Sequence, residues 1–230
     1  MAEEDKSLDL AGIGKLAKAI PDPAWLKLVD TACDTFSKVI APITSTTMGL
    51  GKLIEARFDG MIDAQKVLAA DAVERANKKI KKSNKISKGK IKSTVILSAI
   101  EKASVETDDN IRDIWANLIA NEILDGNVHP EFPRLVERLS SNDAIVLLKI
   151  AQRSQKEKIR LAVRAVIVSL NIFSLNILGG SLTALLEDES DFNREHLSNL
   201  FLIKKSEGTW KLTLLGEEFL KSVSDPSFEP

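Results

Sequence analysis

The sequence has few of the residues on which most metal and nucleophilic sites depend. Cys33 is the only cysteine among 230 residues, so no disulfide can form within the chain. This cysteine usage fits a reducing compartment such as the cytoplasm. The chain has two histidines, His129 and His196, and neither a zinc site nor a cysteine-protease arrangement is legible from them. We therefore predict no metal, no cofactor and no catalytic residue.

Two further signatures are missing. The glycine pairs at residues 12–14 and 49–51 lack a preceding strand and the rest of a dinucleotide fingerprint, so no phosphate-cradling loop is indicated. The N-terminus, MAEEDKSLDL, is acidic where a secretion signal would be basic. We expect a cytoplasmic protein, with a peripheral position at the inner membrane as an alternative.

Charge is nearly balanced overall, because 32 basic and 33 acidic side chains give a net charge of −1. This balance argues against a dedicated nucleic-acid binder, whose surface is usually basic. Residues 78–92, however, contain eight lysines and no acidic residue. This segment could be a solvated linker, a site for anionic lipid headgroups, or a contact for nucleic-acid phosphates. The last is weakened because no aromatic side chain is interleaved for base stacking. The candidate contact residues in this segment are Lys78, Lys79, Lys81, Lys82, Lys85 and Lys88.

Apolar residues make up 44% of the chain, enough to form a core, and their spacing is mostly helical. An Asp108–Asp109 start and a Gly126 stop bound one predicted helix, and Ser140 with Asp143 forms a capping-box start for another. Residues 43–51 are predicted to be a flexible connector. The other helical patterns cover residues 8–20, 25–40, 52–82, 94–105, 132–139, 144–152, 193–199 and 214–223.

The last third of the chain has a different pattern. Residues 161–178 are rich in β-branched side chains, which favours a strand, and Ser206-Glu207-Gly208 is a turn of hairpin length. The sequence therefore predicts a mainly α fold with a C-terminal, winged-helix-like α+β portion that carries a small hairpin. The predicted division is into N-terminal long helices (1–77), a lysine-rich linker (78–93), a central helical bundle (94–156) and the C-terminal portion (157–230).

Three segments leave alternatives open. Residues 165–186 carry no charge over a length that could span a bilayer, but polar residues and glycines interrupt them, which favours a buried strand and helix. Residues 8–93 could instead lie on a membrane as amphipathic helices with a cationic tail. A winged helix could bind DNA through residues 193–199, but neighbouring acidic side chains oppose this.

Three polar residues near Trp115 are further candidates for a contact surface. Trp115 itself lies on an apolar helix face and is predicted to anchor the core. Asn117 and Asn121 are one helical turn apart on a helix face different from that of Trp115. Their spacing predicts either a polar contact surface or a pair of side chains on a solvated helix face. His129 precedes Pro130 in a constrained loop, where it either bonds to backbone or contributes to contact.

Three short strings resemble the Abi-alpha family, bacterial proteins associated with abortive infection, a form of phage defence. They are Trp115-Ala116-Asn117-Leu118, then His129-Pro130 with Phe132, and the closing run from Leu212 to Phe219, together with Leu139, Ser140 and Asp143. The resemblance covers residues 107–220, with a looser match at residues 19–23. It implies phage defence without catalysis and supplies no catalytic residues.

The sequence thus indicates a non-enzymatic defence protein of the abortive-infection type, acting through protein or membrane contacts. The expected partner is another protein or a second copy of the chain, with an anionic membrane surface as an alternative and nucleic acid disfavoured. Two rival functions remain: a membrane-perturbing effector that uses residues 8–93, and a winged-helix DNA-binding regulator.

Overall fold

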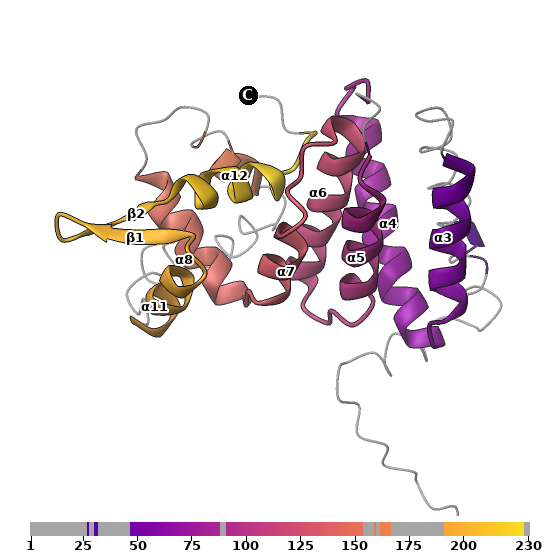
Figure 1. Ribbon diagram of the computed structural model, residues 1–230, viewed down its shortest axis with the longest axis horizontal. Coiled ribbons are helices and arrows are strands. Elements are labelled where there is room, and N and C mark those ends of the chain that lie inside the picture. The colour runs from indigo at the N-terminus through magenta and orange to yellow at the C-terminus, as the bar shows by residue number, and fades with distance from the viewer. Residues whose placement is uncertain are drawn as a thin grey trace, which may run out of the picture.

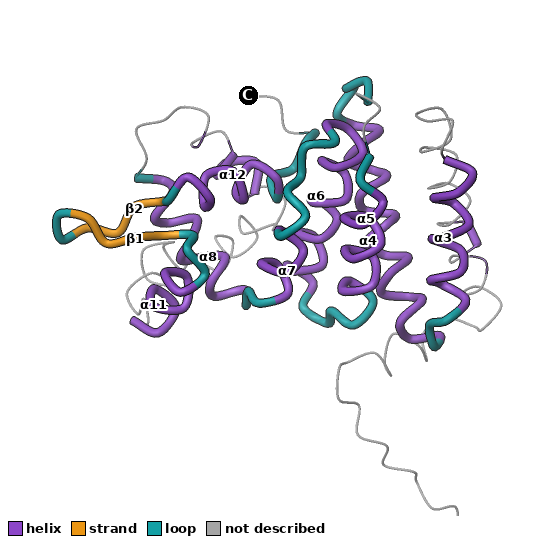
Figure 2. Tube along the Cα trace, viewed as in Figure 1, coloured by secondary structure: helices purple, strands orange, loops and turns teal. Residues whose placement is uncertain are grey.

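Helices form most of the structure, and a two-stranded hairpin lies near the C-terminal end (Figures 1 and 2). The computed structural model describes residues 27, 30–31, 47–87, 91–153, 159, 162–166 and 191–227. This confirms the mainly α fold class. The elements with defined bounds are α3 (Thr47–Asp59), α4 (Asp63–Lys82), α5 (Ser93–Ala103), α6 (Asp109–Asp125), α7 (Phe132–Glu137), α8 (Ser141–Gln152), α11 (Asp191–Asn199), β1 (Ile203–Ser206), β2 (Thr209–Leu212) and α12 (Leu214–Ser222).

Helix α6 occupies the centre of the helical part and packs against α4, α5, α7 and α12. Every residue from 111 to 124 is buried, and Trp115 is only 1% exposed. A helix enclosed on all sides needs no strongly polar face, which explains its weak amphipathic pattern. The Asp108 side chain accepts hydrogen bonds from Asn110 N and Ile111 N, and Gly126 ends the helix at φ 64°. The predicted helix start, the predicted stop and the core position of Trp115 are confirmed.

Helices α4 and α6 run parallel, with α5 antiparallel to both. Ion pairs show this direction, because Arg75 pairs with Asp109 and, one turn further along both helices, Lys79 pairs with Asp113. The C-terminal ends of α4 and α6 therefore meet at one end of the bundle, the upper edge in Figure 1. Residues on both sides of the segment 78–93, which the sequence suggested as a linker between domains, contribute to one hydrophobic core.

The N-terminal helices depart from the sequence prediction in two places. Residues 47–51, expected in a flexible connector, form the start of α3, and Leu50 is buried. The single helix predicted over residues 52–82 is broken between Asp59 and Asp63. Gly60 and Met61 close a turn by donating to Ala56 O and Phe58 O, and the Gln65 side chain accepts from Ile62 N at the start of α4. The predicted helices before residue 43 lie outside the described residues, apart from three isolated helical positions.

Residues 162–166 are helical, so the predicted strand over residues 161–178 is wrong there, and the rest of it lies outside the described residues. β-branched side chains favour strands only weakly when packing against a core decides the conformation. Ala162, Val163 and Val166 are all buried. Among the described residues, the structure has no helix with the length and apolar character needed to cross a membrane.

The C-terminal part joins α11, the hairpin and α12. Strands β1 and β2 pair antiparallel with Ile203 opposite Leu212, and the two turn residues Glu207 and Gly208 both have positive φ, at 52° and 75°. Positive φ at both positions matches the right-handed twist of the flanking strands. The predicted hairpin and closing helix are therefore confirmed, whereas the likeness to a winged helix remains a prediction.

Gly216, in the first turn of α12, holds this helix against the start of the hairpin. A Cβ atom at this position would lie 2.1 Å from Leu202 O, far closer than side-chain carbons approach a backbone oxygen. Thr213 fixes the same contact, since its hydroxyl accepts from Gly216 N and its own N–H donates to Leu202 O. The absence of a side chain at residue 216 is therefore a steric requirement of the fold.

We expect Gly216→Ala to lower the free energy of unfolding by about 3 kcal/mol, because α12 must move away from Leu202 to relieve the overlap. Urea denaturation followed by circular dichroism measures this loss. Gly60→Ala is the matched control: the nearest atom to its Cβ is 3.7 Å away, and the change should be within about 1 kcal/mol. Equal stability of the two variants would contradict the close approach.

Candidate functional site: a charged cleft and a lysine loop

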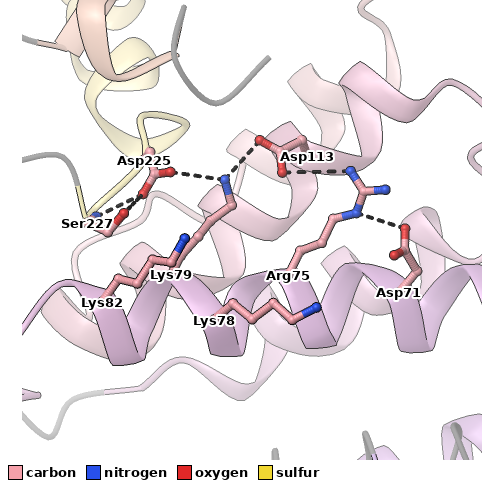
Figure 3. A pocket seen from close by; sticks show the side chains of 8 residues that line it. All are labelled: Asp71, Arg75, Lys78, Lys79, Lys82, Asp113, Asp225 and Ser227. Atoms are coloured by element: carbon pink, nitrogen blue, oxygen red, sulfur yellow. Dashed lines mark hydrogen bonds and ion pairs between the residues drawn. The ribbon is translucent and has the colours of Figure 1, made fainter. Parts of the chain in front are cut away.

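A cleft of about 380 Å³ opens where α4, α6 and the segment after α12 meet (Figure 3). Helix α4 supplies an acidic and several basic side chains, α6 supplies Asp113, and the C-terminal segment supplies Asp225 and Ser227. The lining is thus almost entirely charged or polar. Three parts of the chain that are far apart in sequence meet at this point.

Lys79 is the central cation of the cleft. Its Nζ lies 2.9 Å from Asp113 Oδ2 and 3.2 Å from Asp225 Oδ2, and the Lys79 side chain is only 11% exposed. The predicted role of Lys79 as a surface contact residue is therefore wrong. Removing one member of such a triad would leave a buried charge without full compensation. Lys79 instead ties α4 to α6 and to the end of the chain.

Two arginines and two aspartates continue this network toward the other end of α4. Arg75 bonds to Asp71 at 2.9 Å and to Asp109 at 2.6 Å, and Arg112 bonds to the same two carboxylates at 3.0 and 2.7 Å. The hydrogen bond from Arg75 depresses the pKa of Asp109 in spite of partial burial. Burial lowers the pKa of Arg75, but its bonds to Asp109 and Asp71 outweigh this and raise it above the ordinary value. Arg75 and Asp109 therefore stay ionised near neutral pH.

The pKa of Asp225 reflects a competition between burial and its partner. Burial raises the pKa, whereas the charge of Lys79 and hydrogen bonds from Ser227 lower it, and the net result is a pKa below the usual value. Ser227 donates to Asp225 Oδ1 through both its backbone N–H and its hydroxyl, at 2.8 and 2.7 Å. Asp225 is thereby held as a carboxylate that faces Lys79.

Asn117 and Asn121 lie in the protein interior, so their predicted place on a contact surface is wrong. Asn117 is 0% exposed and donates from Nδ2 to Val223 O at 2.9 Å. Asn121 is 9% exposed and donates to Ser222 O and Ser224 O at 2.9 and 2.8 Å. The last carbonyls of a helix have no partner within the helix. These two amides supply partners for carbonyls at and beyond the end of α12, and fasten that end to α6.

The described residues between α4 and α5, 83–87 and 91–92, belong to a lysine loop and are fixed at several points to α6 and the chain after it. Ser87 Oγ donates to Ile123 O at 2.5 Å, and Lys92 Nζ donates to Gly126 O and Val128 O. Lys78, Lys81, Lys82 and Lys85 are exposed, as a contact surface requires, while Lys88 lies outside the described residues. The interpretation as a freely solvated linker is therefore too simple.

Glu122 is the buried anchor of this loop. Its side chain is 0% exposed, and it accepts from Lys92 N at 2.5 Å and from Val128 N at 3.0 Å. Burial raises the pKa of Glu122, and the hydrogen bonds and charge of Lys92 only partly oppose this. Glu122 thereby holds the start of α5 and the chain after α6 in fixed positions.

His129 and the second histidine lie apart from the cleft's lining. His129 is exposed, and its Nδ1 accepts from Glu131 N at 3.2 Å, as expected for a loop histidine bonded to backbone.

His196 Nδ1 lies 3.2 Å from Asp143 Oδ2, beside Asn193, which donates to Asp143 Oδ1 at 2.8 Å. Burial raises the pKa of Asp143, but hydrogen bonds from Asn193 and Ser140 lower it below the usual value. This cluster joins α8 to α11 and includes the predicted capping box.

Sequence reasoning missed most of the ion-pair network. Its signal was the one-turn spacing of Arg75 and Lys79 on one predicted helix and of Asp109 and Asp113 on another. That spacing shows which charges share a helix face but not which two faces meet. Within the described residues, no group of three or more His, Cys, Asp or Glu side chains is placed to hold a metal ion.

The comparison with protein families finds a match to the family described as abortive infection alpha, over residues 63–200. This range covers more than half of the chain. The chain belongs to the abortive infection alpha family. The comparison with curated proteins and the comparison with solved structures each found no match.

The abortive infection alpha match differs in extent from the range that the sequence strings indicated. It begins at the first residue of α4 and therefore includes the lysine loop, Lys79 and the whole of α6. It ends at Leu200, before the hairpin, so the closing run from Leu212 to Phe219 and the cleft residue Asp225 lie beyond it.

We expect Asn117→Ala to lower the free energy of unfolding by about 2 kcal/mol, because Val223 O loses its donor in a buried position. Asn127→Ala is the matched control, since Asn127 is exposed and its truncation should change stability by less than about 0.5 kcal/mol. Urea denaturation measures both. If Asn117→Ala were as stable as the native chain, the result would contradict the buried hydrogen bond and support a place for Asn117 on the surface.

Asp225→Asn should make stability less dependent on acid pH. The folded-state pKa of Asp225 lies below its unfolded value of about 3.9, so the carboxylate stabilises the folded chain above that value and less as pH falls. The variant should be about 2 kcal/mol less stable than the native chain at neutral pH, and this difference should shrink below about pH 4. Asp59→Asn, at an exposed position, is the control. A difference that stayed constant with pH would contradict the Lys79–Asp225 pair.

Proposed function

We propose that the chain is a non-enzymatic abortive-infection protein that stops phage multiplication through contacts made by its surface. The family match supports this proposal, because it begins at the first residue of α4 and ends one residue after α11. Abortive infection limits a phage by arresting or killing the infected cell. The proposed site of action is the cytoplasm, or the inner face of the membrane.

Contact rather than catalysis is supported by the state of the cleft. Its two central cations are neutralised, because Lys79 and Arg75 are each bonded to two carboxylates. Groups held in this way bind chain segments together and have little freedom to bond to a substrate. Lys78 and Lys82 at the edge of the cleft, and Lys81 and Lys85 near it in the sequence, are exposed and suited to contact with an anionic partner.

A culture that expresses the chain should survive phage added at a low ratio to cells, and should stop growing early at a high ratio. This pair of outcomes separates abortive infection from a block to phage entry, which protects cells at both ratios. Growth curves and phage yield per infected cell, across a broad phage panel, measure it.

Gly216→Ala, which should be less stable, is expected to weaken protection, and Gly60→Ala is expected to retain it. Phage yield equal to that of cells without the chain, across the whole panel, would refute the proposed defence function. Protection accompanied by turnover of a substrate in the purified chain would refute the non-enzymatic part alone.

A further inference from the structure

We propose that the tip of the lysine loop, with the adjacent end of α4, binds the surface of an anionic lipid bilayer. This inference rests on the proposed function and deepens it by naming the partner. The surface comprises Lys81, Lys82, Lys85 and Ile86, and it lies where the C-terminal ends of α4 and α6 meet. It forms the upper edge of the bundle in Figure 1.

The backbone turns outward at this tip. Helix α4 ends at Ser83, whose hydroxyl donates to Ile80 O, and Asn84 then adopts a left-handed conformation with φ 50°. Ile86 follows and is 91% exposed, the highest exposure among the large exposed apolar side chains that the structure describes. A single exposed isoleucine is ordinary on a protein surface, so its meaning depends on its neighbours.

Those neighbours are cationic and lack acidic partners. Lys81, Lys82 and Lys85 are exposed, and none forms an ion pair with another residue in the described part of the chain. Lys78, one turn earlier, is neutralised by Glu74 at 2.7 Å. At this end, the Asp225 carboxylate is bonded to Lys79, and the Glu122 carboxylate is bonded to the backbone of Lys92 and Val128.

Hydrogen bonds within the chain hold the described residues of the loop in place without a partner. Lys85 N donates to Ser83 Oγ, Ser87 Oγ donates to Ile123 O, and Lys92 is fixed by Glu122. A surface ordered in advance loses less conformational entropy on binding. The backbone that carries Lys85 and Ile86 is therefore held at one end of the bundle.

An anionic bilayer suits both the lysines and the exposed isoleucine of this surface. Each lysine near such a membrane strengthens binding by about fivefold, and an aliphatic side chain can enter the boundary between headgroups and acyl chains. Nucleic acid would use the charges but leave Ile86 in water, and residues 83–87 offer no aromatic ring for base stacking. The combination of an apolar tip with uncompensated lysines therefore favours lipid.

The test is flotation of the full chain with vesicles made of equal parts phosphatidylglycerol and phosphatidylcholine, and with vesicles of phosphatidylcholine alone. The native chain should float with the first and not the second, and added salt should weaken its binding. Replacing Lys81, Lys82 and Lys85 together by Gln should lower the partition coefficient by about 100-fold, and Ile86→Ser by about tenfold.

Two matched controls accompany these variants. Lys204, Lys205 and Lys211, exposed on the hairpin, are replaced together by Gln, and Val105→Ser removes an aliphatic side chain that is 60% exposed at the opposite end of the bundle. Both controls should bind like the native chain, and circular dichroism verifies that every variant is folded.

Three results would overturn the inference: no flotation with the anionic vesicles, equal flotation of loop and control variants, or binding of duplex DNA or RNA by the same lysines in place of vesicles. Phage challenge separates this inference from the proposed function. Protection without vesicle binding refutes only the lipid contact, and vesicle binding without protection refutes only the defence role.

Discussion

The architecture depends on the burial of α6, whose buried amides and carboxylates bond to other segments of the chain. A helix enclosed by four neighbours must find a partner for each buried amide and carboxylate, because an unpaired group costs about 1–3 kcal/mol. Asp113 forms an ion pair with Lys79, and the side chains of Asn117 and Asn121 donate to backbone carbonyls after α12. The Glu122 carboxylate accepts from two backbone N–H groups. These bonds lead to α4, to the segment that follows α12, to the start of α5 and to the chain after α6.

These bonds explain why the cleft and the lysine loop lie next to each other. Asp113 and Glu122 are on the same helix, so Lys79 of the cleft and Lys92 of the loop are positioned by one rigid element. Asn117 and Asn121, together with the Lys79–Asp225 ion pair, hold the C-terminal segment at the cleft. Aspartates neutralise Lys79 and Arg75 inside the cleft, whereas Lys82, which also lines it, and the nearby Lys81 and Lys85 have exposed side chains.

Local sequence signals predicted much of the fold. The Asp108 cap, the Gly126 stop, the Ser140–Asp143 capping box and the hairpin turn each depend on residues close together in the chain, whose preferences are strong. The predictions failed where packing decided the outcome. Residues 47–51 became helical because Leu50 reaches the core, and residues 162–166 became helical in spite of their β-branched side chains.

The candidate site was harder to predict than the fold. The sequence identified the lysine-rich segment but could not separate Lys79, which is buried, from Lys81 and Lys82, which are exposed. Nor could it show that the asparagines of α6 face inward, because their partners lie about a hundred residues further along the chain.

The sequence by itself determined where most helices begin and end, since caps, stops and apolar spacing act over a few residues. Tertiary structure alone decided which charges and amides are internal, since that depends on which helix faces meet.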